Sequence, residues 1–232
     1  MGDWNSKYLG KREQAAGTKT FTLERPAELD YRAGQFFFIS IPTNGDWLLH
    51  HFSFSSSPTE RNVEFTTRLT GHEFKNRMDE LEPGATARIA GPDGDFVLRP
   101  EMRKVAYVCG GVGITPVRSN VKWASDTGAD LDIVVLYANR NLESTAFHAE
   151  LEGLASERLR IVNILSEPGP DWHGSTGRID ATFVREQVPD FAERFFFVSG
   201  PPGMARALAG VLADEVKVPS DHLLAELFPG YE

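Results

Sequence analysis

Two adjacent histidines, His50 and His51, open the run HHFSFSSSP, whose side chains could bind a metal or hold a flat ligand. Histidine is a common metal ligand and general base. The run is rich in aromatic and hydroxyl residues, which is typical of a strand, and adjacent residues of a strand point to opposite faces. The two rings are therefore not expected to share a metal. Because the six histidines show no His-x-His or His-x-x-x-His spacing, we predict no metal site.

A second candidate for chemistry is the glycine-rich stretch YVCGGVGITPVRSN. Gly110, Gly111 and Gly113 allow a sharp turn and let a ligand approach the backbone. Thr115 can cap the following helix, and Pro116 suits its first position. A helix N-terminus after a parallel strand directs N–H groups at an anion, so we expect phosphate binding here. An ordinary glycine-rich turn remains the alternative, because Pro116 replaces the last glycine of the usual dinucleotide fingerprint and no P-loop lysine follows.

A similar turn occurs near the end of the chain, where Ser199-Gly200-Pro201-Pro202-Gly203 follows an apolar run and opens a helix. Open α/β sheets bind ligands at the carboxyl ends of their strands. The two turns are expected at the same edge of one sheet, so each strengthens the interpretation of the other.

The two halves of the chain differ in the elements that would position these turns. Residues 1–100 contain short runs rich in Phe, Thr, Ile and Val, separated by turn formers, with one helix expected at 72–81. This pattern is typical of a closed antiparallel barrel. From Lys104 on, near-continuous apolar runs alternate with helical stretches, which predicts a parallel sheet. We place the boundary within residues 98–103 and expect domains at 1–100 and 101–232.

Composition limits the classes of function. The net charge of −9 disfavours nucleic acid as the main ligand, because phosphate backbones require a basic face. The single cysteine, Cys109, excludes an internal disulfide and any four-thiolate zinc or iron–sulfur site on this chain. No apolar run approaches the roughly 18 residues of a membrane span, and no secretory signal is recognisable at the N-terminus. We expect a cytoplasmic protein.

Three segments, in order, resemble motifs of the ferredoxin–NADP reductase-like superfamily of flavin oxidoreductases. The flavin motif Arg-x-Tyr-Ser-x-x-Ser is similar to HHFSFSS at 50–56, and the nicotinamide motif Gly-Gly-x-Gly-x-Thr-Pro matches 110–116 in full. The motif Cys-Gly-Pro-Pro-x-Met matches 199–204, with Ser199 in place of cysteine. GPDGDF at 91–96 and the closing AELFPGYE are weaker matches, so the resemblance covers nearly the whole chain.

The resemblance implies a β plus α/β architecture, a six-stranded antiparallel FAD-binding barrel followed by a parallel-sheet NAD(P)-binding domain. It puts Phe52 against the isoalloxazine ring and Ser56 near the ribityl chain or pyrophosphate. It implies catalytic roles for Ser53 near flavin N5, for Ser199 beside the hydride path, and for Glu226 close to the flavin. The residues expected to bind FAD or the nucleotide are His50, Phe52, Ser53, Ser56, Gly71, Phe74, Lys75, Gly110, Gly111, Gly113, Thr115, Pro116, Gly200, Pro201, Met204, Phe228 and Tyr231.

Three of these assignments have ordinary alternatives. Phe228 and Tyr231 could pack the interface between the domains, and Glu226 could be a solvated carboxylate at the end of a strand. The choice of FAD over FMN rests on RLTGHEFKNRMDEL, residues 68–81, where Gly71 gives backbone access and the amides of Phe74 and Lys75 would face a pyrophosphate. A surface helix after a coincidental glycine is the alternative there.

The sequence contains opposing signals for the choice between NADH and NADPH. NADP-specific relatives tend to have Ser-Arg at the position aligned with Ser166-Glu167. Glu167 would repel a 2′-phosphate, whereas Arg140 or Arg178 could attract one. The sequence alone leans slightly to NADH.

His50 is the main departure from the flavin motif, because relatives usually have arginine there. A permanent cation can bind a phosphate, whereas histidine is neutral through much of the range above pH ~6.5. If His50 carries the phosphate, flavin affinity should weaken as pH rises through its titration. Arg68, Lys75 or backbone amides could carry it instead, and an alignment that brings His51 to the ligand is also open.

The function implied is a flavin-dependent NAD(P)H oxidoreductase that passes hydride from nicotinamide to FAD and then electrons to a separate acceptor. Ferredoxin, flavodoxin, an oxygenase component or a small-molecule dye could each serve as acceptor. The alternative is a non-catalytic flavin-binding electron-relay or regulatory subunit of a larger complex. The complete nicotinamide motif at 110–116 disfavours that alternative, since a relay subunit would not need it.

Overall fold

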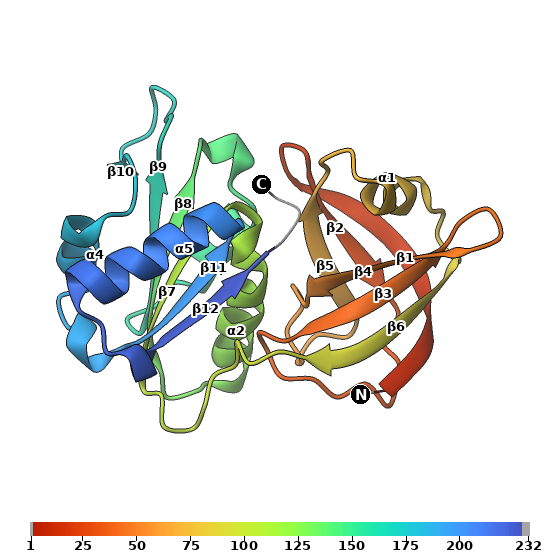
Figure 1. Cartoon of the computed structure of the whole chain (residues 1–232), viewed down its shortest axis with the longest axis horizontal. Helices are drawn as coiled ribbons and strands as arrows, with labels where there is room; N and C mark the ends of the chain where they lie inside the picture. Colours follow the sequence, from red (N-terminus) through yellow and green to blue (C-terminus); the bar gives the residue numbers. More distant parts are fainter. Residues whose placement is uncertain (1, 229–232) are drawn as a thin grey trace.

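Alternating apolar and polar side chains in the first half of the chain form a six-stranded antiparallel sheet that curls into a barrel (Figure 1). The computed structural model describes residues 2–228. The strands occur in the order β4-β3-β6-β1-β2-β5. Their bounds are β1 (Gly2–Ala15), β2 (Thr18–Leu23), β3 (Phe36–Pro42), β4 (Trp47–Ser53), β5 (Val63–Arg68) and β6 (Thr86–Asp93), with helix α1 (Glu73–Glu80) between β5 and β6.

The hydrogen-bonded ladder of this barrel is open between β4 and β5, whereas the sequence predicts full closure. The gap is closed by other contacts. The amides of Ser55 and Ser56 both donate to the carbonyl of Glu64, and the rings of Phe52 and Phe65 stack with centroids 4.4 Å apart. The end of β4, where the aromatic–serine run lies, is therefore held by pairing with β3 on one side and by these hydrogen bonds and ring contacts with β5 on the other.

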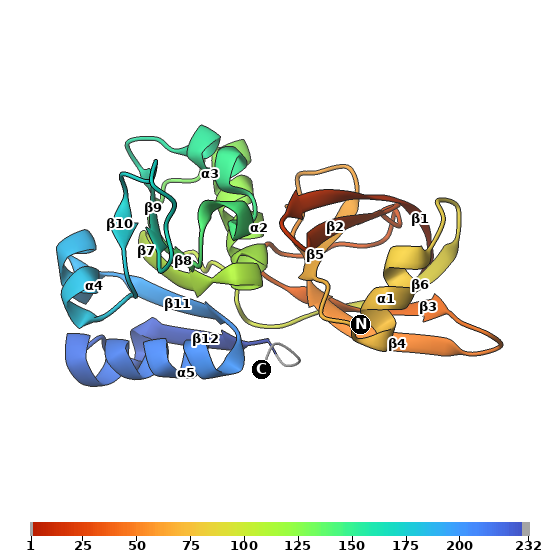
Figure 2. The same ribbon diagram turned by 90° about the horizontal axis from the view of Figure 1, so that it is seen from above.

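The second half of the chain forms a parallel sheet, as predicted. It has six strands, in the order β10-β9-β8-β7-β11-β12. Figure 2 shows helices on both of its faces, which explains the near-continuous apolar runs of its central strands. The strands are β7 (Lys104–Gly110), β8 (Asp132–Asn139), β9 (Leu159–Leu165), β10 (Ser175–Thr176), β11 (Phe195–Gly200) and β12 (Leu223–Leu227). The helices are α2 (Ile114–Thr127), α3 (His148–Leu154), α4 (Ala181–Gln187) and α5 (Pro202–Gly210), which continues as a π-helical turn, η4 (Val211–Val216).

Further 3₁₀ turns connect these elements. They are η1 (Gly111–Gly113), η2 (Leu142–Ser144), η3 (Phe191–Glu193) and η5 (Ser220–His222). Strand β12 was not predicted from the sequence, although it carries Glu226 of the closing segment. Within residues 2–228, no helix is both long and apolar enough to cross a membrane.

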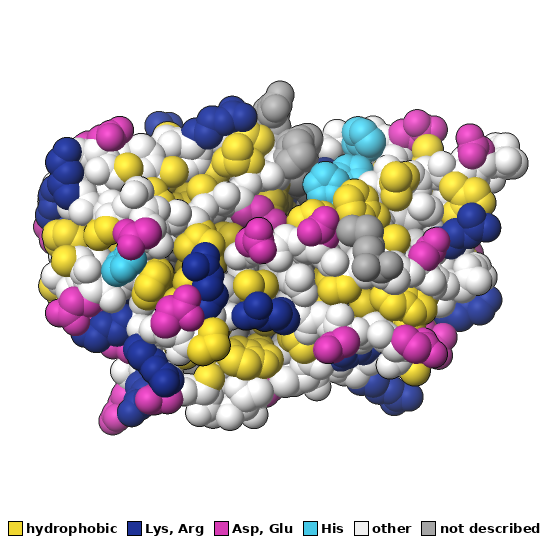
Figure 3. Space-filling view, turned by 60° about the horizontal axis from the view of Figure 1, so that its bottom comes forward, with side chains coloured by type: hydrophobic (Ala, Val, Ile, Leu, Met, Phe, Trp, Pro, Cys, Tyr) yellow, Lys and Arg dark blue, Asp and Glu magenta, His cyan; other side chains and the backbone are white. Residues whose placement is uncertain are grey.

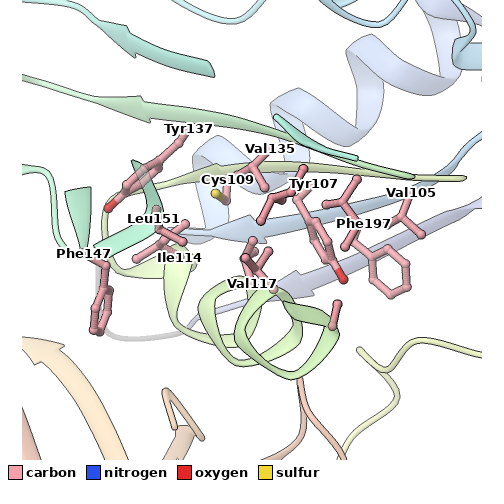
Figure 4. Packing of buried hydrophobic residues seen from close by; sticks show 14 of the residues in the cluster. Val105, Tyr107, Cys109, Ile114, Val117, Val135, Tyr137, Phe147, Leu151 and Phe197 are labelled. Carbon is pink, nitrogen blue, oxygen red and sulfur yellow. The ribbon is translucent and has the colours of Figure 1, made fainter. Parts of the chain in front are cut away.

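The core of the second domain lies between β7, β8, β11 and helices α2 and α3 (Figure 4). Tyr107, Cys109 and Tyr137 are all fully buried there. Burial raises the pKa of the Cys109 thiol well above its usual value. The Tyr137 hydroxyl reaches out of this core to donate to the carbonyl of Gly111 at 3.1 Å. The core thus holds the glycine-rich turn directly.

Helix α2 joins the two domains through polar groups. The buried Arg118 donates to the barrel carbonyl of Ser55 at 2.9 Å and pairs with Glu60 of the barrel and Glu150 of α3. Ser119 donates to the carbonyl of Ser56 at 2.6 Å. These contacts fix the N-terminus of α2 against the end of β4. The exact domain boundary at residue 100 remains a prediction, though β6 ends at Asp93 and β7 begins at Lys104.

Candidate active site

A cavity of about 210 Å³ lies at the seam between the domains, where the end of β4 meets the N-terminus of α2 and the end of β12. We call it the seam cavity. Apolar and aromatic side chains from both domains line it, together with a few hydroxyl, imidazole and carboxyl groups. Its lining residues are Phe36, His50, His51, Phe52, Ser53, Thr66, Val112, Thr115, Glu226, Leu227 and Phe228.

Ser53 presents a polar group to the seam cavity. It is the last residue of β4 and pairs with Phe36 across the ladder, so both side chains lie on the outer face of the barrel. Its hydroxyl makes no hydrogen bond to any part of the chain between residues 2 and 228. A hydroxyl at a cavity wall with no protein partner is available to a ligand.

Glu226 provides the second such group. It lies on β12 opposite Ser199 of β11, and its Oε2 atom is buried with no hydrogen-bond partner among the described residues. Burial raises the pKa of this carboxyl to about 7. A buried carboxylate without a partner is costly. A ligand with polar atoms at its edge would satisfy it, so Glu226 is not an ordinary solvated carboxylate.

Phe52 and His50 contribute their rings to one wall. The His50 and Phe52 rings are nearly parallel, with centroids 4.6 Å apart, and Phe52 also packs into the barrel core. The Nδ1 atom of His50 accepts the amide N–H of His51 at 2.8 Å. Desolvation lowers the pKa of His50. The ring is therefore mostly neutral near pH 7, which works against the cationic role expected from the motif.

A larger cavity, of about 1230 Å³, lies at the carboxyl edge of the parallel sheet. We call it the edge cavity. It is lined by the two glycine turns, through Gly110, Gly111, Pro201 and Met204, and by Gly71 on the barrel side. Among residues 2–228, Val112 alone lines both cavities. The two cavities therefore meet at the N-terminus of α2.

Close packing in the glycine turns explains their composition. Gly111 has φ +52, in the left-handed region. A Cβ on Gly113 would collide with the backbone of Ser199 and Gly200, and one on Gly110 would collide with the side chain of Met204. These glycines let the two turns lie against each other with their backbones facing the edge cavity, which is the arrangement an anion requires.

The predicted capping of α2 is wrong. The helix begins at Ile114 with Gly113 as its N-cap and no side-chain cap, so Pro116 is its third residue. The Thr115 hydroxyl instead donates back to the carbonyl of Val112 at 3.0 Å. Thr115 still lines the seam cavity, whereas Pro116 is buried and lines neither cavity.

Several other predicted residues lie beside the cavities without lining them. The hydroxyl of Ser56 contacts Tyr31 and accepts the amide N–H of Glu64, and Ser199 donates to the carbonyl of Gly113 at 2.7 Å. Both serines are fully buried. Gly200 packs against Gly113, where the two glycine turns contact each other. These residues hold the walls in place, and their contacts with a ligand stay predictions.

Helix α1 begins beside Gly71 at the barrel wall of the edge cavity. Its N-cap, His72, makes no side-chain cap, so the amide of Phe74 in the first turn has no acceptor within the helix. Lys75 is buried and donates to the Thr70 hydroxyl at 3.2 Å. Burial lowers the pKa of its amine to about 8.

The structure adds residues that sequence reasoning missed. Phe36, Thr66, Val112 and Leu227 line the seam cavity, and none was named as a site residue from the sequence. Phe36 and Thr66 lie outside every motif, and Val112 stands at a variable position of the nicotinamide motif. Phe36 could have been found from its register opposite Ser53, once β3 and β4 are paired. Tyr231 lies outside the described residues. Between residues 2 and 228, no group of three or more His, Cys, Asp or Glu is arranged to hold a metal ion.

The cavities suit a bound flavin and nucleotide. The seam cavity combines aromatic walls with an unpartnered hydroxyl and an unpartnered carboxylate, as a flat ring with a polar edge requires. Gly71 and the uncapped start of α1 offer amides to a phosphate on the barrel side of the edge cavity. The residues present therefore fit FAD together with a nicotinamide nucleotide.

Comparisons with known proteins agree with this arrangement. Residues 12–98 match the oxidoreductase FAD-binding domain family and residues 107–209 match the oxidoreductase NAD-binding domain family. The chain is 32% identical over 204 residues to the glycine betaine monooxygenase reductase subunit of Chromohalobacter salexigens, covering 84% of this chain and 55% of that protein. It is 30% identical over 213 residues to ferredoxin–NADP reductase B of Sorangium cellulosum, covering 85% of each chain.

A solved structure has the same fold. A ferredoxin NADP⁺ reductase from Neisseria gonorrhoeae with bound FAD and NADP superposes with a TM-score of 0.82 at 16% identity, covering 97% of this chain and 99% of that one. The chain spans about half the length of the glycine betaine monooxygenase reductase subunits that it matches. With an FAD-binding domain followed by an NAD-binding domain, the chain belongs to the ferredoxin–NADP reductase-like superfamily.

Proposed function

We propose that this protein is an FAD-dependent NAD(P)H oxidoreductase that transfers electrons to a separate acceptor. The observation that carries the proposal is the seam cavity, where the unpartnered groups of Ser53 and Glu226 from different domains face one space. That space adjoins the glycine turns of the edge cavity at Val112. A flat redox group and a nucleotide would thus lie side by side between the domains.

The chain's residues would position the two ligands. When bound, FAD accepts a hydride from reduced nicotinamide and releases the two electrons to an acceptor. Phe52 and Phe228 would contact the faces of the ring, and the Ser53 hydroxyl would donate to its edge. Glu226, with a carboxyl pKa of about 7, can hold a proton at Oε2 near neutral pH and so donate or accept a hydrogen bond.

Ser199 has a positioning role in this proposal. Its hydroxyl is bonded to the Gly113 carbonyl and holds the two glycine turns together. The turns would bind the nucleotide pyrophosphate through backbone N–H groups. The start of α1 and Gly71 would bind the second phosphate of the flavin cofactor, which favours FAD over FMN.

We further propose that NADPH is the preferred nucleotide, against the slight leaning of the sequence to NADH. Arg140 and Arg178 line the edge cavity with Ser166, whereas Glu167 does not. Neither guanidinium forms an ion pair with any residue in the range 2–228. Two cations beside a hydroxyl favour a 2′-phosphate. The backbone holds this wall, since the Glu167 amide donates to the Arg140 carbonyl at 2.7 Å.

The acceptor in this proposal is a ferredoxin, a flavodoxin or an oxygenase component. Relatives named as reductase subunits of a monooxygenase and as a ferredoxin–NADP reductase support that range. A cytoplasmic location is part of the same proposal, because the single cysteine is typical of a protein that works without disulfides.

Anaerobic titration of the purified protein tests the proposal. Bound flavin is identified by its visible absorbance and its mass after release, and NADPH or NADH is then added without oxygen. We expect bound FAD whose absorbance bleaches with one equivalent of NADPH. Bound FAD that neither nucleotide reduces would contradict the proposal and favour a non-catalytic electron-relay subunit.

A further inference from the structure

The outer surface of strands β3 and β4 is apolar and aromatic over most of its length. Phe38 pairs with His51, and Leu49 with Ser40, so these side chains share the face opposite the barrel core. The outer face of an antiparallel barrel is usually polar. We call this surface the outer β3–β4 face and define it by Phe36, Phe38, Trp47, Leu49 and His51.

This face is open to solvent and carries little charge. Leu49 is 65% exposed, the most of any large hydrophobic residue described. The Phe38 and His51 rings lie 5.9 Å apart beside it. On the neighbouring strand, Arg88 lies over the Trp47 ring at 4.1 Å. Figure 3 shows hydrophobic side chains grouped near histidines on the barrel domain. An apolar patch of this kind marks an interaction site.

The outer β3–β4 face runs directly into the seam cavity. Phe36 and His51 belong to both, and Leu227, which is 38% exposed, borders the cavity from β12. The edge cavity shares none of these residues, and no residue of β3 or β4 lines it. A flavin ring bound in the seam cavity could therefore be approached along the outer β3–β4 face while a nucleotide occupies the edge cavity.

We propose that the outer β3–β4 face docks the electron-accepting protein, a redox protein with an apolar, weakly charged rim around its own redox centre. The inference rests on the proposed function. In the balanced reaction, one NAD(P)H supplies two electrons to two one-electron acceptors, giving NAD(P)⁺, two reduced acceptors and one proton. A second copy of this chain on the same face would block the approach to the seam cavity, so the acceptor is the occupant that the reaction requires.

Charge substitution at the centre of the face tests the proposal. Leu49→Glu is compared with Leu9→Glu, which adds the same charge at a leucine 45% exposed on another barrel strand. The FAD-loaded variants are assayed with NADPH and a fixed set of acceptors: a [2Fe–2S] ferredoxin, a flavodoxin and ferricyanide. For the better protein acceptor, Leu49→Glu should raise KM at least about tenfold, as expected for an interface anchor. Leu9→Glu should leave that KM unchanged.

Two further readouts separate docking from damage to the redox site. In Leu49→Glu, the anaerobic reduction of bound flavin by NADPH and the rate with ferricyanide should stay at wild-type values. Photocross-linking uses Leu49→benzoylphenylalanine and Leu9→benzoylphenylalanine with the same protein acceptor. A cross-link from position 49 alone, still formed with saturating NADP⁺, is the expected result.

Equal increases in KM from the substitutions at positions 49 and 9 would overturn the docking proposal. So would cross-links from position 49 that form only to a second copy of this chain. The proposal also fails if NADPH reduces the bound flavin but the reduced protein passes electrons to neither protein acceptor. Failure of both nucleotides to reduce the bound flavin would instead defeat the proposed function. The two failures are thus distinguishable.

Discussion

The seam cavity and the edge cavity are built in different ways. Part of the wall of the edge cavity is backbone, from turns that need glycine for space or for a positive φ, and this part adjoins side chains such as Arg140 and Arg178. The seam cavity is made of side chains brought together from β3, β4, α2 and β12. A backbone site is encoded by a short local motif, whereas a side-chain site depends on strand register and on the docking of two domains. The two sites should therefore respond differently to substitution.

The largest effect is expected at Gly113. A Cβ there meets the backbone of Ser199 and Gly200, so Gly113→Ala should displace the turn. We expect a loss of roughly 1–3 kcal/mol in the free energy of unfolding. The rate of flavin reduction by NADPH should fall about 100-fold, because the turn that orients the nucleotide moves. Denaturant unfolding and stopped-flow absorbance measure the two effects.

Gly153→Ala is the control for Gly113→Ala. Gly153 lies in helix α3, and a Cβ added to it would have no neighbouring atom within 4 Å. This substitution should stabilise the protein by roughly 0.5–1 kcal/mol and leave flavin reduction unchanged. Equal effects of the two substitutions would show that close packing of the turns is unimportant.

The next effect concerns the arginines of the edge cavity. Arg140→Ala and Arg178→Ala should each raise the KM for NADPH about tenfold and leave the KM for NADH nearly unchanged, because only NADPH carries the 2′-phosphate. Steady-state kinetics with both nucleotides measure this selectivity. Glu167→Ala should change neither value, since Glu167 does not line the cavity. Equal increases in KM for NADH and NADPH would show that these arginines do not select for the 2′-phosphate.

The pH dependence of protein stability tests the buried environment of Glu226 in the seam cavity. Its carboxyl pKa is about 7 in the folded protein against 4.5 for the ordinary group. The folded state therefore binds this proton more tightly, and its contribution to stability is lost as pH rises from about 4.5 through 7. Relative to Glu226→Gln, the flavin-free wild type should lose roughly 1–2 kcal/mol between pH 5 and 8. Denaturant unfolding that shows the same pH dependence for both would contradict a buried, unpartnered carboxyl.

The smallest effect is expected at His50. Its pKa is lowered by burial, so the ring is mostly neutral near pH 7 and above. FAD affinity measured by fluorescence should therefore change less than about threefold between pH 7 and 8, in contrast to the titration expected from the sequence. A steep loss of affinity over that range, abolished in His50→Gln, would restore a charged role for His50.

The difference between the cavities also explains what could be predicted from the sequence. The glycine turn at 110–116 was predicted because its residues are contiguous and each has a local physical reason. Ser53 was singled out because it stands at the serine position of the flavin motif that the run at 50–56 resembles. Phe36 was missed because its place in the seam cavity follows only from the register of β3 with β4.

Other differences have tertiary causes. Ser56 and Ser199 stand at motif positions, yet their hydroxyls are bonded to Glu64 and Gly113, which lie 8 and 86 residues away in the chain. Strand β12 was missed because its five residues have no strand pattern and gain their structure by pairing with β11. The gap between β4 and β5 is bridged by the stacked rings of Phe52 and Phe65, a contact that only the folded barrel brings about.

The burial of Cys109 has a practical consequence for experiments on this protein. The chain has no other thiol, and the raised pKa of this buried one keeps it protonated and poorly reactive. The natural sequence therefore already behaves as a cysteine-free background. A single engineered thiol, such as Leu49→Cys or Leu9→Cys, could carry a fluorescent or spin label without protecting or replacing any native residue.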